Sequence, residues 1–288
     1  MRVAVTGGAG FLGSHICDRL VETGHDVVVV DVASSAWVPA DRPFVAADVR
    51  SENDLREAFA GCQAVVHCAA VADLATSRAN PRLAIDVNVT GTLNALEAAS
   101  ACGARRFLQA SSVYALSRYG SVYRTTKQAA ERLVEDLAED LGLRATILRF
   151  GSLYGPRADE QNAIRRMVEQ AVRERRIDFW GDGTEVREYV HVRDAAALSV
   201  DALDDEYAGR ALHITGPERV KTREVMETIR EILGGDVEIT VCLDPLEGRY
   251  RITPYALDPS PGVRITAKTF VDLELGLLES LRAHMEEA

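Results

Sequence analysis

Short apolar runs alternate with amphipathic stretches through the first half of the chain. Residues 26–31 include four consecutive valines, a pattern typical of a strand that is buried on both faces of a parallel sheet. Six such runs predict strands, at residues 2–6, 26–31, 44–46, 64–67, 106–110 and 145–150. Helical spacing follows them from after the glycine-rich stretch 7–13 to about residue 23, and near residues 51–59, 81–102 and 122–141. This alternation predicts an α/β fold with a doubly wound parallel (Rossmann) sheet and right-handed crossovers.

The regular alternation of strands and helices ends after Phe150, and the predicted elements beyond it are less regularly spaced. The pattern predicts helices near 159–174, 192–204 and 221–233, strands near 187–191, 210–214 and 237–241, and a last amphipathic helix from about 270 to 285. We interpret residues 1–155 as a dinucleotide-binding domain to which 187–204 return. Residues 156–288 form a smaller mixed α/β substrate-binding domain in this interpretation.

Composition narrows the class of protein. The 288 residues are 47% hydrophobic and 27% charged, which suits a packed core and not a disordered chain. No stretch approaches the roughly 20 apolar residues of a membrane helix, and the first strand begins at once, without a signal peptide. The five cysteines are scattered and form no Cys-x-x-Cys pair. We therefore expect a cytoplasmic protein without a structural metal, a disulfide framework or a membrane partner.

The charge pattern bears on the partner. A net charge of -11 argues against nucleic acid, because binding to phosphate backbones needs a basic field. An anionic small molecule is still compatible if a few arginines gather in a cleft. Only three of the 33 basic residues are lysines, namely Lys127, Lys221 and Lys268. Each lysine is therefore more informative than in an average chain.

A glycine-rich turn follows the first strand. In Gly7-x-x-Gly10-x-x-Gly13, the first glycine suits the tight turn, the second a close pyrophosphate and the third helix packing on the strand. Asp31 ends the second strand, where a carboxylate would bind ribose hydroxyls and repel a 2′-phosphate, so NAD is favoured over NADP. Asp48 and Val49 follow the third strand, where they could contact the edge of the adenine ring. A surface turn without a ligand contact is a nearly equal alternative.

Tyr123 and Lys127 lie four residues apart on a predicted helix and therefore share a face. A nearby ammonium, aided by the positive nicotinamide ring, should lower the pKa of the phenol and let it accept a proton. Ser111 and Ser112 end the fifth strand at the ligand-binding edge. Strand alternation lets only one of them face the site, and we favour Ser112.

Several groups of residues resemble the extended short-chain dehydrogenase/reductase family, in its nucleotide-sugar epimerase and dehydratase branch. The resemblance covers nearly the whole chain and is carried by residues 5–15, 67–70, 88–92, 111–114, 181–184 and 187–192, with Tyr123 and Lys127. It implies that Ser112, Tyr123 and Lys127 are catalytic. It also implies a bound NAD, contacted by Gly7, Gly10, Phe11, Leu12, Gly13, Asp31, Asp48, Val49, Ala69, Ala70, Asn88, Tyr123 and Lys127.

The same resemblance bears on the substrate and the assembly. Arg187 is expected at the diphosphate of a nucleotide sugar, with Ser111, Ser152 and Arg249 as further substrate contacts. Ser152 stands where the family commonly has an asparagine, and the segment from Tyr114 to Tyr123 is shorter than usual. Family members often form homodimers through two helices of each subunit, which here would be 81–102 and 122–141.

The residues after Ser112 narrow the chemistry that the resemblance implies. Dehydratases of this branch carry an Asp-Glu pair there and sugar-acid decarboxylases a glutamate, whereas this chain has Val113 and Tyr114. An epimerase fits best, and we expect a UDP-sugar 4-epimerase that works through a transient 4-keto intermediate. The alternatives are a nucleotide-sugar dehydrogenase or reductase with net redox turnover, and a non-catalytic NAD-binding regulator.

Overall fold

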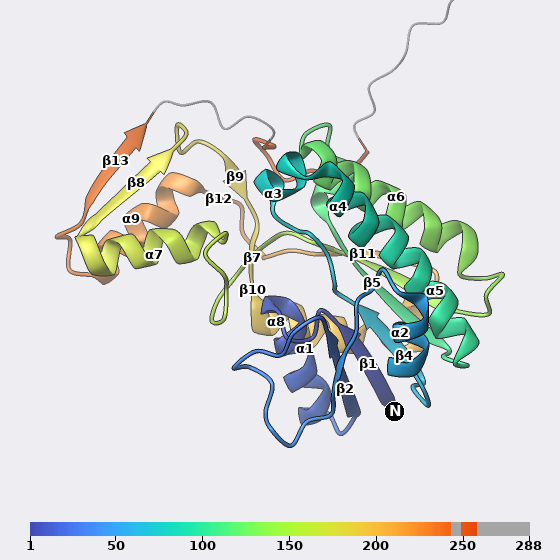
Figure 1. Ribbon diagram of the computed structural model, residues 1–288. Coiled ribbons are helices and arrows are strands. Elements are labelled where there is room, and N and C mark those ends of the chain that lie inside the picture. The colour runs from blue at the N-terminus through green and yellow to red at the C-terminus, as the bar shows by residue number, and fades with distance from the viewer. Residues whose placement is uncertain (243–248, 258–288) are drawn as a thin grey trace, which may run out of the picture. The chain divides into compact units, whose positions relative to one another are not determined.

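The computed structural model describes residues 1–242 and 249–257 of the chain. Its main sheet has seven parallel strands in the order β11-β6-β5-β4-β1-β2-β3 (Figure 1). These strands are β1 (Arg2–Thr6), β2 (Asp26–Asp31), β3 (Phe44–Ala46), β4 (Ala64–His67), β5 (Arg106–Ser112), β6 (Arg144–Phe150) and β11 (Ala211–Ile214). The predicted doubly wound α/β fold is confirmed.

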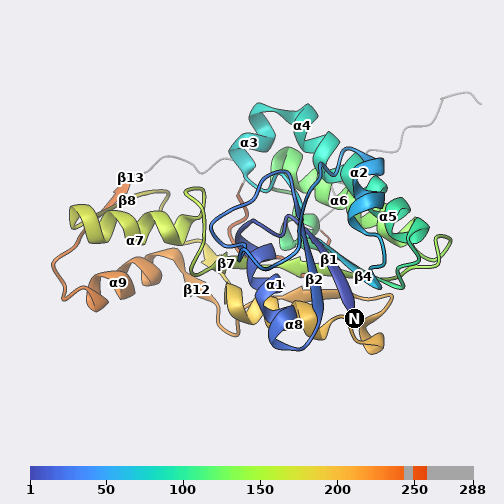
Figure 2. The ribbon, with the colours of Figure 1, turned by 60° about the horizontal axis from the view of Figure 1, so that its bottom comes forward.

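Helices cover both faces of this sheet (Figure 2). The helices α1 (Phe11–Glu22) and α8 (Val192–Asp201) lie on one face, and α2 (Glu52–Ala58), α5 (Gly91–Ala101) and α6 (Ser121–Leu137) lie on the other. Side chains alternate along β1 because successive residues of a strand point to opposite faces. Val3 and Val5 pack on the α1 side, whereas Ala4 packs on the α5 side. The sheet is therefore buried on both faces, as its valine-rich strands predict.

The predicted helix 81–102 is interrupted in the structure. It consists of α4 (Pro81–Ile85), a π-helical turn at Asp86–Thr90, and α5. Asn80 caps the start of α4 by accepting a hydrogen bond from the backbone N–H of Leu83 at 3.1 Å, and proline suits the first helical position. A short helix before it, α3 (Leu74–Ala79), was not predicted from the sequence.

Among the described residues, the second part of the chain contains three two-stranded sheets and a separate apolar core. The pairs are β7 (Ser152–Tyr154) with β10 (Tyr189–His191), β8 (Arg176–Trp180) with β13 (Glu238–Cys242), and β9 (Val186–Arg187) with β12 (Val220–Lys221). The helices α7 (Ala163–Glu174) and α9 (Thr222–Ile232) contribute to this core. The buried members are Met167, Ala171, Ile177, Phe179, Met226 and Val237.

One strand lies in a different place from the one predicted. We expected residues 210–214 in the smaller part, but β11 pairs in parallel with β6 and becomes the seventh strand of the main sheet. Ile214 packs into the same apolar cluster as α8, so this strand and α8 return to the sheet together. The last predicted helix, near 270–285, lies outside the described residues. Within the described residues, no helix is long and apolar enough to cross a membrane.

Candidate active site

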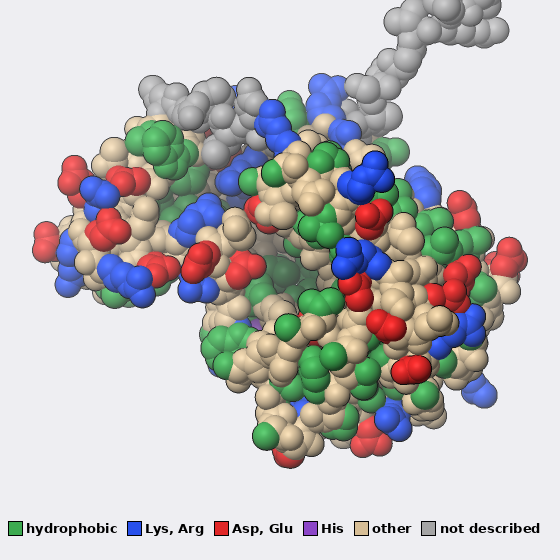
Figure 3. All heavy atoms as spheres, viewed as in Figure 1, with side chains coloured by type: hydrophobic (Ala, Val, Ile, Leu, Met, Phe, Trp, Pro, Cys, Tyr) green, Lys and Arg blue, Asp and Glu red, His purple; other side chains and the backbone are tan. Residues whose placement is uncertain are grey.

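A cavity of about 1080 Å³ lies where the carboxyl ends of the main strands meet residues of α7, β8 and β9. Parallel strands end at one edge of a sheet, which is where open α/β sheets bind their ligands. Figure 3 shows the surface hollowed near the middle of this face, with acidic and basic side chains around the hollow. Pockets for one drug-sized ligand span about 300–1,000 Å³. The cavity therefore has room for more than one small ligand.

The structure brings most of the predicted site residues to this cavity. Those that line it are Gly7, Gly10, Phe11, Leu12, Gly13, Asp31, Asp48, Val49, Ala69, Ala70, Ser111, Ser112, Tyr123, Lys127, Ser152, Arg187 and Arg249. Asn88 does not line it and is considered separately below. Residues far apart in the sequence thus meet at one edge of the sheet, as the strand order requires.

The turn between β1 and α1 leaves no room for side chains. Gly7 has a φ of 66°, and a Cβ atom there would lie 2.8 Å from the backbone nitrogen of Ala69. A Cβ atom on Gly13 would lie 2.1 Å from the carbonyl oxygen of Gly7. The N-cap residue Gly10 offers no side-chain cap to the first turn of α1. The free N–H groups of that turn are therefore available to phosphate oxygens, and the residues fit a dinucleotide.

Asp31 holds its carboxylate over this turn. Its oxygens accept hydrogen bonds from the backbone N–H groups of Ala9 at 3.0 Å and Val32 at 2.8 Å. A carboxylate oxygen has lone pairs for more than one donor, so the group can still accept from a ribose hydroxyl. This is the position that favours NAD and opposes a 2′-phosphate.

Asp48 lines the same end of the cavity but already has local partners. Its carboxylate accepts from the backbone N–H of Arg50 at 2.9 Å and forms an ion pair with the guanidinium of that residue. The side-chain hydrogen bond from Arg50 holds the pKa of Asp48 below its usual range. Asp48 therefore closes a surface turn, and Val49 beside it is the buried, apolar neighbour of the cavity.

Tyr123 and Lys127 project from α6 toward the end of β5. Lys127 is buried, and its Nζ donates to the carbonyl oxygen of Ala110 at 2.9 Å. That Nζ lies 5.9 Å from the centre of the Tyr123 ring. Ser112 lies beside Tyr123, and its hydroxyl opposes the rise in the tyrosine pKa that burial causes. The predicted serine, tyrosine and lysine are thus together in one wall of the cavity.

The expected lowering of the tyrosine pKa is not what the protein alone produces. Burial raises the pKa of Tyr123 to about 12, and the Ser112 hydroxyl opposes this rise only in part. Burial also lowers the pKa of Lys127 to about 8. Removal from water disfavours the charged form of each group. The sequence analysis expected the ammonium of Lys127 to lower the pKa of Tyr123. In the protein without a cofactor, burial is the largest influence and raises that pKa.

The choice between the two serines is decided by where each hydroxyl points. Ser111 donates to Oε1 of Glu131 at 2.5 Å, on the side of the sheet that α6 covers. Its hydroxyl is therefore engaged inside the protein, although the residue borders the cavity. Ser112, the next residue, carries the hydroxyl that meets Tyr123. The prediction of a substrate contact for Ser111 is not supported by this geometry.

Asn88 lies behind the cavity wall. Its side chain accepts from the backbone N–H of Val71 at 2.7 Å and donates to the carbonyl oxygen of Val71 at 3.0 Å. The same amide nitrogen donates to the hydroxyl of Thr126 at 2.9 Å. Asn88 therefore ties the loop after β4 to α6. Asn88 is therefore near the active-site helix, as expected, but it does not line the cavity in which the cofactor contact was predicted.

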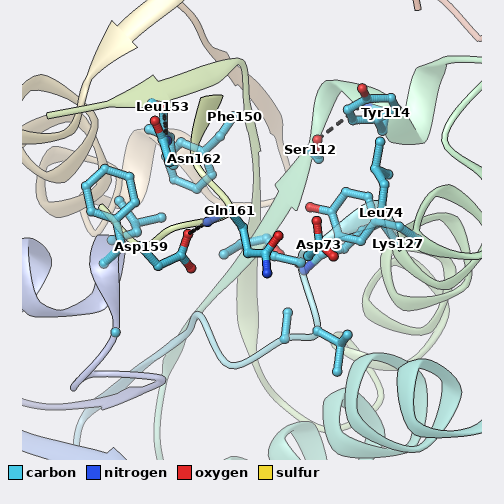
Figure 4. Close-up of a pocket in the computed structure, with 18 of the residues that line it drawn as sticks. Asp73, Leu74, Ser112, Tyr114, Lys127, Phe150, Leu153, Asp159, Gln161 and Asn162 are labelled. Carbon is cyan, nitrogen blue, oxygen red and sulfur yellow. Dashed lines mark hydrogen bonds between the residues drawn. The ribbon is translucent and has the colours of Figure 1, made fainter. Parts of the chain in front are cut away.

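Tyr114 is a site residue that the sequence did not reveal. It lies in the short 3-10 helix Val113–Leu116, and its N–H donates to Oγ of Ser112 at 3.2 Å (Figure 4). Its ring meets the Tyr123 ring edge-on at 6.0 Å. At Gly120, with a φ of 110°, a Cβ atom would lie 2.6 Å from the Tyr114 ring. In the sequence, Gly120 within the shortened segment from Tyr114 to Tyr123 was the signal that could have indicated a close contact there.

Tyr114 connects the catalytic end of the cavity to Arg187. The Tyr114 and Tyr250 rings lie 4.6 Å apart, and the guanidinium of Arg187 lies 4.0 Å above the Tyr250 ring. The guanidinium of Arg187 is also close enough to Tyr114 to oppose the rise in the pKa of its hydroxyl that burial causes. We call Tyr114, Tyr250 and Arg187 the aromatic stack. It holds the buried guanidinium of Arg187 close to the part of the cavity that contains Tyr123, where an anionic group of a ligand can bind to it.

Other residues singled out in the sequence have structural roles. His67 is buried, forms a hydrogen bond with the Thr6 hydroxyl at 2.7 Å, and burial lowers its pKa to about 3. His191 caps α8 by accepting from the N–H of Arg193. Arg251 pairs with Asp182 at 2.9 Å.

The glycine turn, the aspartate at the end of β2 and the Ser–Tyr–Lys group all line one cavity, and the comparison with known proteins agrees with this arrangement. Residues 3–215 match the model of the NAD dependent epimerase/dehydratase family. The chain belongs to this family. It is therefore a nucleotide-sugar enzyme of the NAD-dependent type, and NAD is its cofactor.

Several proteins of this family are similar along most of the chain. The UDP-glucose 4-epimerase of Streptomyces lividans is 30% identical, with 80% of each chain covered. The structure of a Thermus thermophilus UDP-glucose 4-epimerase with NAD has a TM-score of 0.79 and 30% identity, and covers 90% of this chain and 91% of that one. A Thermotoga maritima UDP-glucose 4-epimerase structure with UDP-glucose has a TM-score of 0.81 and 27% identity, covering 99% and 100%.

Related chains are also named for other reactions. A UDP-N-acetyl-alpha-D-glucosaminuronate decarboxylase of Bacillus cytotoxicus is 28% identical, with 80% of each chain covered. A dTDP-glucose 4,6-dehydratase of Mycolicibacterium smegmatis is 29% identical, covering 98% of this chain and 92% of that one. Membership of the family therefore establishes the cofactor and the general chemistry, and the particular reaction has to be argued from the site.

Asp31 gives the first prediction, which concerns cofactor choice. We expect Asp31→Ala to weaken NAD binding about tenfold to a hundredfold, because a hydrogen bond to a charged group contributes about 1.5–3 kcal/mol. Binding of NADP should weaken less, so discrimination against it falls. Asp31→Asn is the matched control, since it keeps an acceptor for Ala9 and removes only the charge. Calorimetric titration with both cofactors measures this, and unchanged affinities would show that the ribose lies elsewhere.

Proposed function

We propose that the protein is an NAD-dependent nucleotide-sugar 4-epimerase that acts on UDP-sugars through a transient 4-keto intermediate. The observation that carries this proposal is the placement of Ser112 and Tyr123 side by side in one wall of the cavity. They lie beside the buried Lys127, in the cavity that the dinucleotide turn also lines. The epimerase names of the similar chains from Streptomyces, Thermus and Thermotoga support the same reaction.

The residues beside Ser112 support an epimerase over a dehydratase. Val113 and Tyr114 follow it, so the chain places an apolar and an aromatic side chain where elimination of water would use acids. Asp73 and Asp159 also line the cavity. Each is engaged by its own turn, because Asp73 accepts from the N–H of Thr76 and Asp159 from the N–H of Gln161. Asp73 thereby caps α3 and Asp159 closes a turn, and neither of them is in the sequence position directly after Ser112.

The chain's own groups move and hold the proton of the reaction. NAD, when bound, supplies the hydride acceptor and a positive charge near Tyr123. Tyr123 accepts the proton of the 4-hydroxyl as the sugar is oxidised and returns it after the keto sugar has turned over. Ser112 donates to the same oxygen and aligns it with Tyr123. Lys127 places its ammonium 5.9 Å from the centre of the Tyr123 ring, where a positive charge favours the phenolate that proton transfer forms.

We also propose that the two parts of the chain divide the ligands between them. Residues 1–155 supply the glycine turn and the catalytic group, with residues 187–204 returning to pack beneath them. Arg187, at the start of that returning segment, and Arg249, from the later residues, supply positive charges for the diphosphate, and both arginines line the cavity. Arg187 is buried in the aromatic stack, so its charge is already positioned when the substrate enters.

The first test of this function is Tyr123→Phe with a panel of UDP-, dTDP-, GDP- and CDP-sugars. We expect turnover to fall by about 10²–10⁴-fold, the usual contribution of a positioned acid or base, whereas co-purifying NAD is retained. Tyr119→Phe is the matched control, because Tyr119 is exposed and should leave turnover unchanged. Chromatography with mass spectrometry follows conversion of a sugar nucleotide into an isomer of equal mass.

Other outcomes of this assay are equally decisive. Steady production of NADH from added NAD would replace the epimerase with a dehydrogenase. Retained NAD without turnover of any sugar in the panel would favour a regulator. Normal turnover in the Tyr123→Phe variant would remove this residue from the mechanism. The proposal is supported if the wild-type protein converts a UDP-sugar into its isomer and the Tyr123→Phe variant does not.

The aromatic stack gives a prediction about the nucleotide end. We expect Tyr114→Ala to weaken UDP binding by up to about tenfold, because an aromatic pair contributes about 0.5–1.5 kcal/mol beyond burial and Arg187 would lose its neighbour. Tyr114→Phe retains the ring and should bind UDP nearly as the wild type does. Calorimetry with UDP measures both variants. Equal affinity for Tyr114→Ala and the wild type would contradict the role of the stack.

We further propose a homodimer through α4–α5 and α6. Partly exposed apolar side chains support it, because Val122, Ala129 and Leu133 lie on one face of α6 and Ile85 at the end of α4 is 49% exposed. We expect light scattering to give twice the chain mass and Ala129→Arg to halve it. Leu198→Arg, on the exposed side of α8, is the control. A monomeric wild-type protein would contradict this assembly.

A further inference from the structure

Glu131 is a buried carboxylate that the proposed reaction does not use. It lies on α6, four residues after Lys127, and is only 5% exposed. Burying a carboxylate is costly unless charged or hydrogen-bonding partners compensate for the loss of water. The groups that bind the Glu131 carboxylate therefore show which parts of the protein it connects.

Two strands supply those partners. From β6, Arg149 donates through Nε to both carboxylate oxygens at 3.0 and 3.2 Å, and through Nη2 at 2.7 Å. From β5, the Ser111 hydroxyl donates at 2.5 Å. This planar guanidinium pairing is geometrically specific. Glu131 is thus held in one orientation between the ends of two neighbouring strands.

The same strand end is held a second time by Lys127. Its Nζ donates to the carbonyl oxygen of Ala110, the residue before Ser111. Consecutive residues of β5 are therefore bound by side chains one helical turn apart on α6. The next residue along β5 is Ser112, and one turn earlier on α6 is Tyr123. Any slip of the helix along the strand would separate these two hydroxyls.

We propose that Glu131 is a positioning residue of the active site, whose carboxylate keeps α6, and with it Tyr123 and Lys127, in register with the end of β5. Its consequence for turnover rests on the proposed function. Its consequence for the charge of Lys127 does not, because that charge can be measured without any sugar.

Among the described residues that influence the pKa of Lys127, Glu131 is the negatively charged group. Burial raises the pKa of the Cys68 thiol to about 12 and that of Tyr123 to about 12, so both are neutral near pH 7. Burial also lowers the pKa of His67 to about 3, which keeps it neutral. Of the groups acting on the pKa of Lys127, Glu131 is therefore the one that is charged and that raises it.

The groups that face Glu131 determine the expected sign. Arg149 is its cation, and the His213 ring on β11 lies 3.5 Å from Arg149. Burial lowers the pKa of His213, so this ring is neutral near pH 7. Glu135, one turn further along α6, is exposed and pairs with Arg132. Removing the Glu131 charge should therefore lower the pKa of Lys127, and removing Arg149 should raise it.

Competitive acetylation at a series of pH values measures this pKa by mass spectrometry of the intact protein's peptides. The chain has only three lysines, and the exposed Lys221 is the internal reference. Burial lowers the pKa of Lys127 to about 8 in the wild type. In Glu131→Gln we expect the midpoint to fall by about one pH unit, the usual scale for loss of a close opposite charge. Arg149→Gln should raise it.

The sign of the shift separates positioning from a merely structural role. General loosening of the site would admit water and move the Lys127 midpoint upward, toward the ordinary lysine value. A fall in Glu131→Gln therefore supports the proposal, and an unchanged or raised midpoint overturns it. Glu135→Gln is the matched control and should not shift the midpoint. If Glu131→Gln does not fold cooperatively, Arg149→Gln decides the question, and an unmoved midpoint there overturns the proposal.

Turnover provides a second measurement. With the sugar that the wild type converts, Glu131→Gln should lower kcat more than it raises KM and move the alkaline limb of the kcat profile to lower pH. A lowered midpoint in labelling without a matching shift in turnover would show that Lys127 is charged by Glu131 but that the proposed reaction is wrong. The two failures are therefore distinguishable.

Discussion

The contact between α6 and the end of β5 is the constraint on which the cavity depends. Lys127 donates to the Ala110 carbonyl at 2.9 Å, and Ser111 donates to Glu131 at 2.5 Å. A helix is rigid over one turn, so these two bonds also place Tyr123 opposite Ser112. The cofactor turn, the arginines and the aromatic stack then surround a pair of hydroxyls whose separation is already determined.

This arrangement carries an electrostatic cost that a purely structural core would avoid. Lys127 and Glu131 are buried, and charges taken out of water are stabilised only when partners are close and well oriented. Arg149 and Ser111 compensate Glu131, whereas Lys127 has one backbone acceptor and a pKa lowered to about 8. Groups with perturbed pKa values gather where chemistry is done. The imbalance at Lys127 is therefore consistent with a functional lysine.

Interactions between neighbouring residues made the fold predictable. The valine runs predicted buried parallel strands, and the glycine spacing predicted the turn between β1 and α1 because both depend on a few consecutive residues. The interruption at Asp86–Thr90 and the placement of β11 were missed. Periodicity in the sequence shows that a segment is a strand, but it does not show which neighbour that strand pairs with.

The sequence by itself determined the parallel sheet, the dinucleotide turn and the shared helical face of Tyr123 and Lys127. Only the tertiary structure decided that Ser112 and not Ser111 meets the tyrosine, that Asn88 lies behind the wall, and that burial raises the pKa of Tyr123. It alone also assembled the aromatic stack and the Glu131–Arg149 pair. Local spacing acts over one or two turns, whereas these contacts join segments that only the folded sheet brings together.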